Sequence, residues 1–298
     1  MTRSVFLGEP DTEGRGEFNH IFKSGVELSK RLTLVDSMTD ADVLLLDALR
    51  TSRPRAGTLV SQAKDCGCEV VAVDYSDDPQ SMRLSEVPGI DRFLKRSMVH
   101  REHGASSGLI DYPVACAHIA YCVREDILAY ALNASCPARD LDIACFHSTE
   151  LLERHGQTKR GLIAQTLSHQ LPKSYSREIG HVGFKGVRGR NEVNPDYVDT
   201  LLRSLIVVNC QPDRWEGDYR LFEALACGPL VMCDRMLRPP QGLEDGKHLI
   251  FYDGPSDLLE KACYYLEDEE ERLKIAGQGQ LAAITEHRSR HRMEQACL

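Results

Sequence analysis

Short apolar runs alternate with amphipathic stretches along the whole chain, and this alternation limits the possible folds more than any other feature. The runs are typical of buried strands, and they are Ser4–Leu7, Ala41–Asp47, Glu69–Asp74, Leu141–Phe146, Ile179–Phe184, Ser204–Asn209, Leu230–Cys233 and Leu249–Tyr252. The stretches between them have helical spacing, as in Phe18–Leu32, Thr58–Lys64, Arg124–Leu132, Leu151–Leu171, Tyr197–Leu202, Ser256–Leu266 and Glu269–Ile284. Strands that are apolar throughout and separated by helices belong to parallel sheets covered on both faces. The sequence therefore predicts an α/β protein.

One break in this pattern divides the chain. The segment NASCPARD, Asn133–Asp140, combines proline with small polar residues, as linkers do. The β/α pattern starts again after it, and two sets of similar size predict two Rossmann-like halves. We expect an N-terminal domain over 1–135, a C-terminal domain over 136–284, and a basic helical tail over 285–298 that is able to pack back on the N-terminal domain.

The composition is that of a soluble globular protein, because 42% of the 298 residues are hydrophobic and 27% are charged. The 36 basic and 45 acidic residues give a formal net charge of −9, which disfavours nucleic acid as a partner. No segment is long and apolar enough for a transmembrane helix, and the N-terminus lacks the apolar run of a signal peptide.

The cysteines and histidines give no metal-site pattern. Of the 11 cysteines, four lie inside apolar runs, as reduced core cysteines do: Cys145, Cys210, Cys227 and Cys233. Cys66 and Cys68 are the one close pair, and no second pair completes a zinc-site spacing. His287 and His291 stand four residues apart without a carboxylate partner, which favours a solvated face of the tail. We therefore expect no metal and a reducing, cytoplasmic location.

The stretch GDYRLFEALACGPLVMCD, from Gly217 to Asp234, predicts a loop, a helix and a strand in sequence. Gly217 and Asp218 provide a turn and an N-cap. Gly228 is suited to the left-handed position after a helix, and Pro229 prevents the helix from continuing. In an open parallel sheet such a helix N-terminus lies beyond the carboxyl ends of the strands, where ligands bind.

Arg220 and Glu223 lie three residues apart in the first turn of this otherwise apolar helix. A helix N-terminus and an arginine suit phosphate, and a carboxylate one turn deeper suits the hydroxyls of a ribose. The pair therefore matches a nucleoside diphosphate. The same spacing is also that of a surface ion pair, which is common and weakly stabilising. Spacing alone slightly favours the surface ion pair over a ligand site.

The ordered blocks from Ser204 to the C-terminus change this balance. RLFEALACGPLVMCD is followed by GLEDGKHLIFYDGPSDLLEKACYYLEDEEERLKIAGQGQ and EHRSRHRMEQ. Together they resemble the C-terminal half of GT-B glycosyltransferases, most of all the CgeB-like and exostosin-like branch (glycosyl transferases group 1). VDYSDDP, FLKRSM and DYPV in the first half resemble N-terminal blocks of the same branch. The resemblance implies two Rossmann-like domains whose parallel sheets face a central cleft.

The resemblance also implies a nucleotide-sugar donor site in the C-terminal domain, with Glu223 on the ribose. The residues expected to bind the donor are Gly217, Asp218, Tyr219, Arg220, Glu223, His181 and Arg160. His181 lies where a GT-B fold holds the base, and Arg160 follows the first strand of the domain as a phosphate candidate. An exposed helix face is the alternative for Arg160 and its neighbours Arg154 and Lys159. Glu216 and Glu223 are one residue closer than the two glutamates of many retaining relatives, which favours inversion.

An inverting transferase needs a base for the acceptor hydroxyl, and two acidic loops of the N-terminal half offer one. The loop GEPDTEGRGE carries Asp11 and Glu13, and the loop DYSDDP carries Asp74 and Asp78. Asp78 and Asp11 are the leading candidates, whereas a solvated acidic loop or a helix N-cap is the alternative for each. Lys95 and Arg96 are further phosphate candidates, or an ordinary basic helix end. Trp215 is a candidate to stack on the base of the nucleotide or on an acceptor sugar. The alternative is that it anchors its loop.

These observations predict a metal-independent glycosyltransferase, hexosyl or pentosyl, that acts in polysaccharide biosynthesis. It would use a nucleotide-diphosphate sugar, with UDP favoured, and a glycan or other hydroxyl acceptor, and it would require no cofactor. A UDP-sugar epimerase or a glycan phosphorylase on the same fold is the first alternative. A non-catalytic nucleotide-sugar-binding assembly module is the second.

Overall fold

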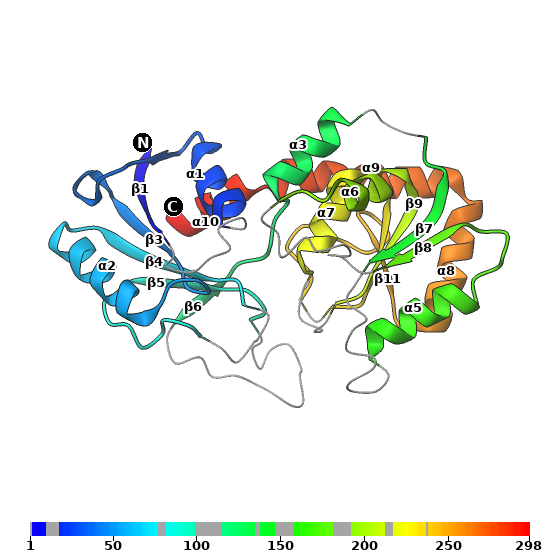
Figure 1. Ribbon diagram of the computed structural model, residues 1–298, viewed down its shortest axis with the longest axis horizontal. Coiled ribbons are helices and arrows are strands. Elements are labelled where there is room, and N and C mark those ends of the chain that lie inside the picture. Colours follow the sequence, from blue (N-terminus) through cyan, green and yellow to red (C-terminus); the bar gives the residue numbers. More distant parts are fainter. Residues whose placement is uncertain are drawn as a thin grey trace. The chain divides into compact units, whose positions relative to one another are not determined.

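The chain forms two compact units, which are described separately. Unit 1 contains residues 1–125 and 287–298, and unit 2 contains residues 126–286. The computed structural model describes residues 2–9, 18–76, 82–98, 115–134, 138–146, 158–180, 192–211, 217–236 and 238–298 (Figure 1). Among these residues, no helix is both long and apolar enough to cross a membrane.

Unit 1 is built on a parallel sheet of six strands. Its order is β2-β1-β3-β4-β5-β6, formed by Leu32–Leu34, Arg3–Gly8, Val43–Asp47, Glu69–Asp74, Arg92–Lys95 and Cys116–His118. Every pair of neighbouring strands is parallel. The strand order reverses between β1 and β3, so this is where the connecting helices change from one face of the sheet to the other.

Helices cover both faces of this sheet (Figure 1). Helix α2, Arg53–Asp65, packs Leu59 and Val60 against Leu44 and Leu46 of β3 on one face. The other face is covered by a π-helical turn at Phe18–Lys23, by α1 at Ser24–Glu27 and by the C-terminal α10 at Ser289–Cys297. Both faces are thus buried, which is why β3 is apolar at consecutive positions.

Unit 2 is a second parallel sheet, with five strands in the order β11-β10-β9-β7-β8. The strands are Ile250–Tyr252, Leu230–Asp234, Ser204–Asn209, Leu141–Phe146 and Arg177–Gly180. The order reverses between β7 and β9, the first and third strands of the unit. In folds of this kind, ligands bind beyond the carboxyl ends of the strands at this reversal.

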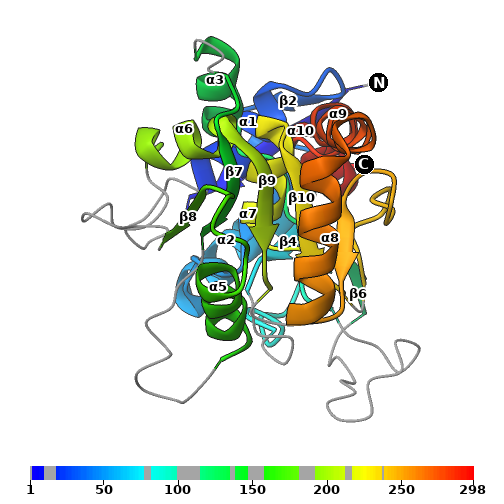
Figure 2. The same cartoon turned by 90° about the vertical axis from the view of Figure 1, so that its right-hand side faces the viewer.

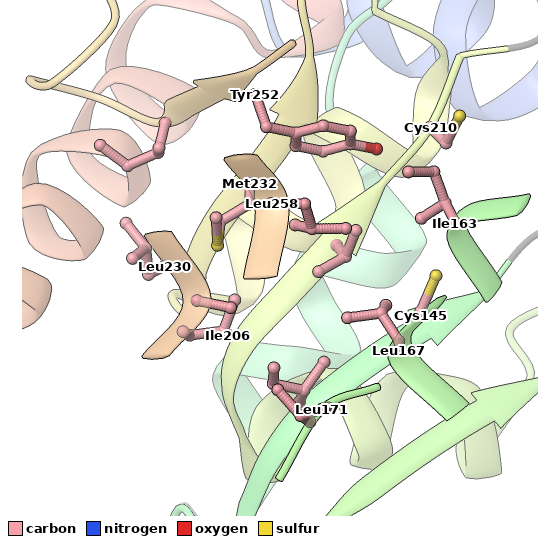
Figure 3. Packing of buried hydrophobic residues seen from close by; sticks show 14 of the residues in the cluster. Cys145, Ile163, Leu167, Leu171, Ile206, Cys210, Leu230, Met232, Tyr252 and Leu258 are labelled. Atoms are coloured by element: carbon pink, nitrogen blue, oxygen red, sulfur yellow. The ribbon is translucent and has the colours of Figure 1, made fainter. Parts of the chain in front are cut away.

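The helices of unit 2 also cover two faces. Helices α5, Lys159–His169, and α8, Pro255–Glu267, lie on one face, as Figure 2 shows. The other face carries further described helices: α6 at Pro195–Arg203, α7 at Tyr219–Cys227 and α9 at Glu269–Glu286, with α3 at Glu125–Asn133 beside α6. The core between α5, α8 and the sheet is apolar apart from a few thiols and a tyrosine hydroxyl (Figure 3).

The two-sheet α/β fold confirms the prediction, but several local expectations were wrong. Phe18–Leu32 is not one helix, because a π-helical turn and a single α-turn are followed by the short strand β2. The strand predicted at Ile179–Phe184 begins two residues earlier, at Arg177, and its described part ends at Gly180. Lys95 and Arg96 do not end a helix, since they stand at the end of strand β5. His287 is buried in unit 1 and does not lie on a solvated tail face.

Candidate functional site

The polar side chains of unit 2 gather where its strand order reverses. Strands β7 and β9 end at Phe146 and Asn209, and the N-termini of α5 and α7 lie at the same edge of the sheet. A small cavity of about 10 Å³ opens here, lined by Phe146, Tyr197, Leu201, Val207, Val208, Asn209 and Arg220. This volume is enough for one water-sized group. The site predicted around Arg220 therefore lies at the position that the fold favours for ligands.

Asp218 starts helix α7, as the sequence predicted. It is the N-cap residue, and its Oδ1 accepts a hydrogen bond of 2.9 Å from the backbone N–H of Arg220. The helix ends at Gly228, whose φ of +79° is the left-handed conformation that glycine adopts without strain. Gly217 precedes the cap because a side chain there would overlap Leu221. These local rules place Arg220 and Glu223 in the first turn.

The carboxylate of Asp218 also contacts two guanidinium groups. Its Oδ2 lies 3.3 Å from Nη2 of Arg160 on α5 and 3.0 Å from Nη1 of Arg220. The three side chains are 3%, 13% and 11% exposed. Arg160 also donates from Nε to the carbonyl oxygen of Cys210 at 2.8 Å. Two arginines from different helices therefore lie side by side at one helix N-terminus, which suits a phosphate group.

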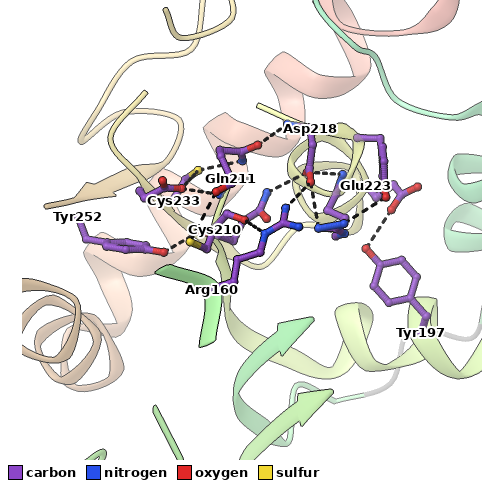
Figure 4. A network of polar contacts seen from close by, with 12 residues as sticks. Arg160, Tyr197, Cys210, Gln211, Asp218, Glu223, Cys233 and Tyr252 are labelled. Carbon is purple, nitrogen blue, oxygen red and sulfur yellow. Dashed lines mark hydrogen bonds and ion pairs between the residues drawn. The ribbon is translucent and has the colours of Figure 1, made fainter. Parts of the chain in front are cut away.

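A second acid and an amide extend this network (Figure 4). Asp234, at the end of β10, pairs with Lys159 and accepts a hydrogen bond of 2.7 Å from the backbone N–H of Gln211. The side-chain oxygen of Gln211 in turn accepts from the backbone N–H of Asp218 at 2.7 Å. The ends of β9 and β10 are thus tied to the start of α7. The exposed-face alternative for Arg160 was wrong, while Lys159 is half-exposed and paired.

Glu223 is buried, with 1% of its surface exposed, so the alternative of a surface ion pair with Arg220 was wrong. Its Oε2 accepts a hydrogen bond of 2.9 Å from the hydroxyl of Tyr197 on α6. Arg220 pairs with Asp218 and donates from Nη2 to the hydroxyl of Tyr219 at 3.2 Å. A buried carboxylate next to buried arginines is an arrangement that can bind a ligand carrying both hydroxyls and an anion.

Arg220 keeps donor capacity in this arrangement. Within the part of the chain that the structure describes, its Nε is buried without a hydrogen-bond partner. The same holds for Oδ1 of Asn209, and both residues line the small cavity. Buried polar atoms without partners are rare in proteins, and a bound group or a water molecule is one explanation for them. A hydroxyl group or a water molecule would satisfy both atoms, because it donates and accepts.

The thiols beneath the site are neutral. Burial, followed by the nearby Asp234 carboxylate, raises the pKa of Cys210 to about 12. Burial, followed by Glu223, raises the pKa of Cys227 to about 12. Thiols that stay protonated are poor nucleophiles and poor metal ligands. Burial therefore disfavours the thiolate form of Cys210 and Cys227.

Four acids of unit 1 were predicted as candidates for the catalytic base, and Asp74 is the one that lies among the described residues. Its side chain is completely buried. Its two oxygens accept hydrogen bonds from the backbone N–H groups of Ser76, at 2.8 Å, and Arg83, at 3.3 Å. The ammonium group of Lys95 lies 3.5 Å from Oδ2 and donates to the hydroxyl of Ser76 at 3.0 Å. These contacts hold the start of the loop after β4. Arg96, also buried, lies with its guanidinium carbon 4.5 Å from the ring centre of Tyr121.

Several predicted site residues lie outside the described residues. They are the candidate catalytic acids Asp11, Glu13 and Asp78, then His181, the candidate contact to the nucleotide base, and also Trp215 and Arg154. The structure describes the strands that precede the segments with these residues. The loop with Asp11 and Glu13 follows β1, which borders the strand reversal of unit 1, and the loop with Asp78 follows β4.

Three residues of the site were not predicted, namely Tyr197, Asn209 and Gln211. Tyr197 has the spacing of a core residue of its helix, and Asn209 and Gln211 follow an apolar strand. The available signal was position, because polar residues just beyond a buried parallel strand are placed at the ligand edge of the sheet. Among the described residues, no group of three or more histidine, cysteine, aspartate or glutamate side chains is arranged to hold a metal ion.

Comparisons with known proteins bear on the same half of the chain. Residues 160–297 match the family model of glycosyl transferase-like proteins. In a comparison of sequences with curated proteins, nothing matches. The narrower resemblance to the CgeB-like and exostosin-like branch stays a prediction, since the matching model describes glycosyl transferase-like proteins in general.

Solved structures match nearly the whole chain. Anabaena HepE in complex with UDP-glucose is similar with a TM-score of 0.55 and 12% identity, over 99% of this chain and 98% of that one. A glycosyltransferase from Rickettsia africae is similar with a TM-score of 0.59 and 11% identity, over 99% and 96%. TarM is similar with a TM-score of 0.54 and 14% identity, over 86% of this chain and 54% of that one. The chain therefore has the GT-B fold.

Proposed function

We propose that the chain is a glycosyltransferase that moves a hexosyl or pentosyl group from a nucleotide-diphosphate sugar to a hydroxyl group of a glycan or similar acceptor. The observation that carries this proposal is the arrangement at the start of α7. There, Arg160 and Arg220 share the carboxylate of Asp218, and Glu223 follows one turn later. The match of residues 160–297 to glycosyl transferase-like proteins supports it.

The two arginines would bind the diphosphate and stabilise the negative charge that develops as it leaves. Glu223 would accept hydrogen bonds from the ribose hydroxyls, with Gly217 and Tyr219 completing the loop around it. His181 stays our candidate for contact with the base of the nucleotide. UDP is the favoured nucleotide, and the UDP-glucose complex of the structurally similar HepE supports this choice. Because side chains supply the positive charge, we propose that the reaction needs no metal ion.

The base that activates the acceptor is proposed to come from the acidic loops of unit 1. Asp78 and Asp11 remain the leading candidates, followed by Glu13. The position of the first loop after β1, at the strand reversal, supports Asp11 and Glu13. Asp74 is buried against Lys95 and backbone N–H groups, so we propose that it supports the second loop and its Asp78. Inversion at the anomeric carbon would follow from a single displacement.

Calorimetric titration in EDTA tests the donor site. We expect UDP to bind more tightly than GDP or dTDP. We expect Glu223→Ala to lose about 10- to 100-fold in affinity, because a hydrogen bond to a charged group contributes roughly 1.5–3 kcal/mol. Arg203→Met is the matched control, since Arg203 lies on α6 in the same unit and forms an exposed pair with Asp140. It should leave the affinity for UDP unchanged.

Two results would contradict the proposal. If no nucleotide binds, or if Glu223→Ala binds UDP as tightly as the unaltered chain, the arrangement at α7 is not a donor site. If UDP-sugars bind but no acceptor yields a transferred sugar, a non-catalytic binding module replaces the enzyme. A screen that follows UDP release with a panel of acceptors separates these outcomes.

A further inference from the structure

The hydroxyl of Tyr197 donates a hydrogen bond to Glu223, and both residues are nearly inaccessible to solvent. The hydrogen bond is 2.9 Å long, and the exposed fractions are 7% for Tyr197 and 1% for Glu223. Figure 4 shows the phenol ring pointing from α6 toward the glutamate on α7. A carboxylate that is removed from water depends on such donors, since an unmet hydrogen bond to a buried charge is costly.

The ring of Tyr197 is itself held firmly. It packs edge-on against Phe146 at the end of β7, with ring centres 5.6 Å apart and planes at 84°. Its backbone N–H donates to the side chain of Asn194, the N-cap of α6, and Pro195 fixes the first turn of that helix. A phenol group held on two sides is suited to fix the direction of the carboxylate to which it donates.

Tyr197 also lies next to the phosphate side of the site. It lines the same small cavity as Arg220 and Phe146. The polar end of this one side chain therefore contacts the candidate ribose carboxylate, while its ring borders the candidate phosphate arginine. A core tyrosine with a purely structural role would need neither neighbour.

We propose that Tyr197 is a positioning residue for the donor: it orients Glu223 so that the carboxylate accepts hydrogen bonds from the hydroxyl groups of the ribose. The inference rests on the proposed function, because it assumes that Glu223 binds a nucleotide ribose. Tyr197 acts through Glu223 and has no part in bond making or breaking. Its role is selective for nucleotides that carry both ribose hydroxyls.

The test compares the binding of UDP and 2′,3′-dideoxy-UDP, measured by calorimetry, in the full chain and in Tyr197→Phe. The phenylalanine keeps the ring and its packing but removes the hydroxyl. We expect the full chain to prefer UDP by at least about tenfold, as hydrogen bonds to a carboxylate allow. In Tyr197→Phe, the affinity for UDP should fall about five- to tenfold, whereas that for the dideoxy nucleotide should stay the same. The preference is thereby nearly lost.

Two further variants separate positioning from structure. Phe146→Leu loosens the packing that holds the ring without removing the hydroxyl, so it should reduce the preference for UDP, but less than Tyr197→Phe does. Tyr197→His carries an imidazole that is shorter than the phenol, so its N–H stops short of Glu223 and the preference should be lost as in Tyr197→Phe. This variant gives the same test if Tyr197→Phe fails to fold. With a UDP-sugar donor and a working acceptor, Tyr197→Phe should raise KM for the donor and leave kcat within about twofold.

The outcomes distinguish this inference from the function on which it rests. If the full chain does not bind UDP, or binds both nucleotides equally, the proposed donor site and the inference fail together. If the full chain prefers UDP and Tyr197→Phe keeps that preference, the role of Tyr197 alone is overturned. A loss of affinity that is equal for both nucleotides in Tyr197→Phe would assign Tyr197 a structural role.

Discussion

The carboxylate of Asp218 contributes both to the stability of unit 2 and to its candidate ligand site. It caps α7 through Oδ1, and its Oδ2 faces the guanidinium groups of Arg160 and Arg220. Both arginines are largely buried, so their charges are poorly hydrated and the Asp218 carboxylate offsets part of that cost. A bound diphosphate would bring further negative charge to the same place. Stability and ligand binding are therefore coupled at this residue.

The substitution Asp218→Asn isolates the charge, because asparagine is as good an N-cap as aspartate. We expect the unfolding transition that involves unit 2 to lose about 1–3 kcal/mol, since two largely buried arginines lose their partner. We also expect UDP to raise Tm more in Asp218→Asn than in the unaltered chain, because the diphosphate replaces the missing charge. Thermal unfolding with and without UDP measures both effects.

Asp140→Asn serves as the control, since Asp140 forms an exposed pair with Arg203 in the same unit. It should change stability by no more than about 0.5 kcal/mol, as exposed ion pairs contribute little. Equal stability of Asp218→Asn and the unaltered chain would show that the arginines do not depend on Asp218.

At the scale of single residues, the sequence predicted what is local and missed what is distant. The N-cap role of Asp218 follows from its neighbours, because capping involves residues two or three positions apart. Its pairing with Arg160 joins residues 58 positions apart, and the bond from Tyr197 to Glu223 joins residues 26 apart. Such partners depend on how helices stack on the sheet. The helical periodicity predicts that Tyr197 is buried, but it does not predict which residue accepts the hydrogen bond of its hydroxyl.

At the scale of elements, helix α9 approaches other parts of unit 2 closely at one glycine. A side chain at Gly279 would overlap the backbone carbonyl oxygen of His248 and lie 2.9 Å from a methyl group of Leu225 on α7. Gly277, two positions earlier on the same helix, has open space around it. The pair therefore separates the need for a close approach from the general cost of glycine in a helix.

We expect Gly279→Ala to destabilise unit 2 by roughly 1–3 kcal/mol, because backbone atoms must move to accept the methyl group. Gly277→Ala should be neutral or stabilise by up to about 1 kcal/mol, since alanine favours the helix. Urea unfolding monitored by circular dichroism compares the two variants. If both shift the midpoint in the same direction and by the same amount, α9 does not require contact at Gly279.

Short elements were predicted less well than long ones. The strands β2 and β6 have three residues each and include polar side chains, so they show no apolar run. The equally short β11 was predicted because its residues lie in such a run. The basic pair Lys95 and Arg96 suggested a helix end, because charges usually lie on exposed faces. The structure buries both: Lys95 pairs with Asp74 and Ser76, and Arg96 packs against Tyr121. A buried lysine is acceptable only with partners that come from other strands, which a linear pattern does not reveal.

At the scale of the whole molecule, the alternation of apolar runs and amphipathic stretches was enough to predict two parallel sheets. It could not predict the strand order, because many orders share the same alternation. The reversal between β7 and β9 is what brings Phe146, Tyr197, Asn209 and Arg220 around one cavity. The candidate site therefore depends on topology as much as on the motif that first indicated it.

The last twelve residues show why unit 1 is not continuous in sequence. Helix α10 covers its sheet with Met293, Ala296 and Cys297, all fully buried. Arg3 and Arg92 donate to the carbonyl oxygens of Cys297, at 2.7 Å, and Ala296, at 2.5 Å. Arg292 donates to the carbonyl oxygens of Ala120 and Tyr121, both at 3.0 Å. Without α10, this apolar face and these polar groups would be left without their contacts.

We therefore expect deletion of residues 287–298 to unfold unit 1 while unit 2 stays folded. The described core between α5, α8 and the sheet of unit 2 is formed by residues between Ile143 and Ala276, and none of them belongs to α10. Limited proteolysis should degrade the first 125 residues of the truncated chain and leave a fragment close to 126–286. Removal of Leu298 alone, which is 38% exposed, is the control and should leave both units resistant. If the truncated chain kept a protease-resistant unit 1, the remaining helices on that face would have to cover the sheet by themselves. The short α1, at Ser24–Glu27, spans about 6 Å of helix and is too small for that role.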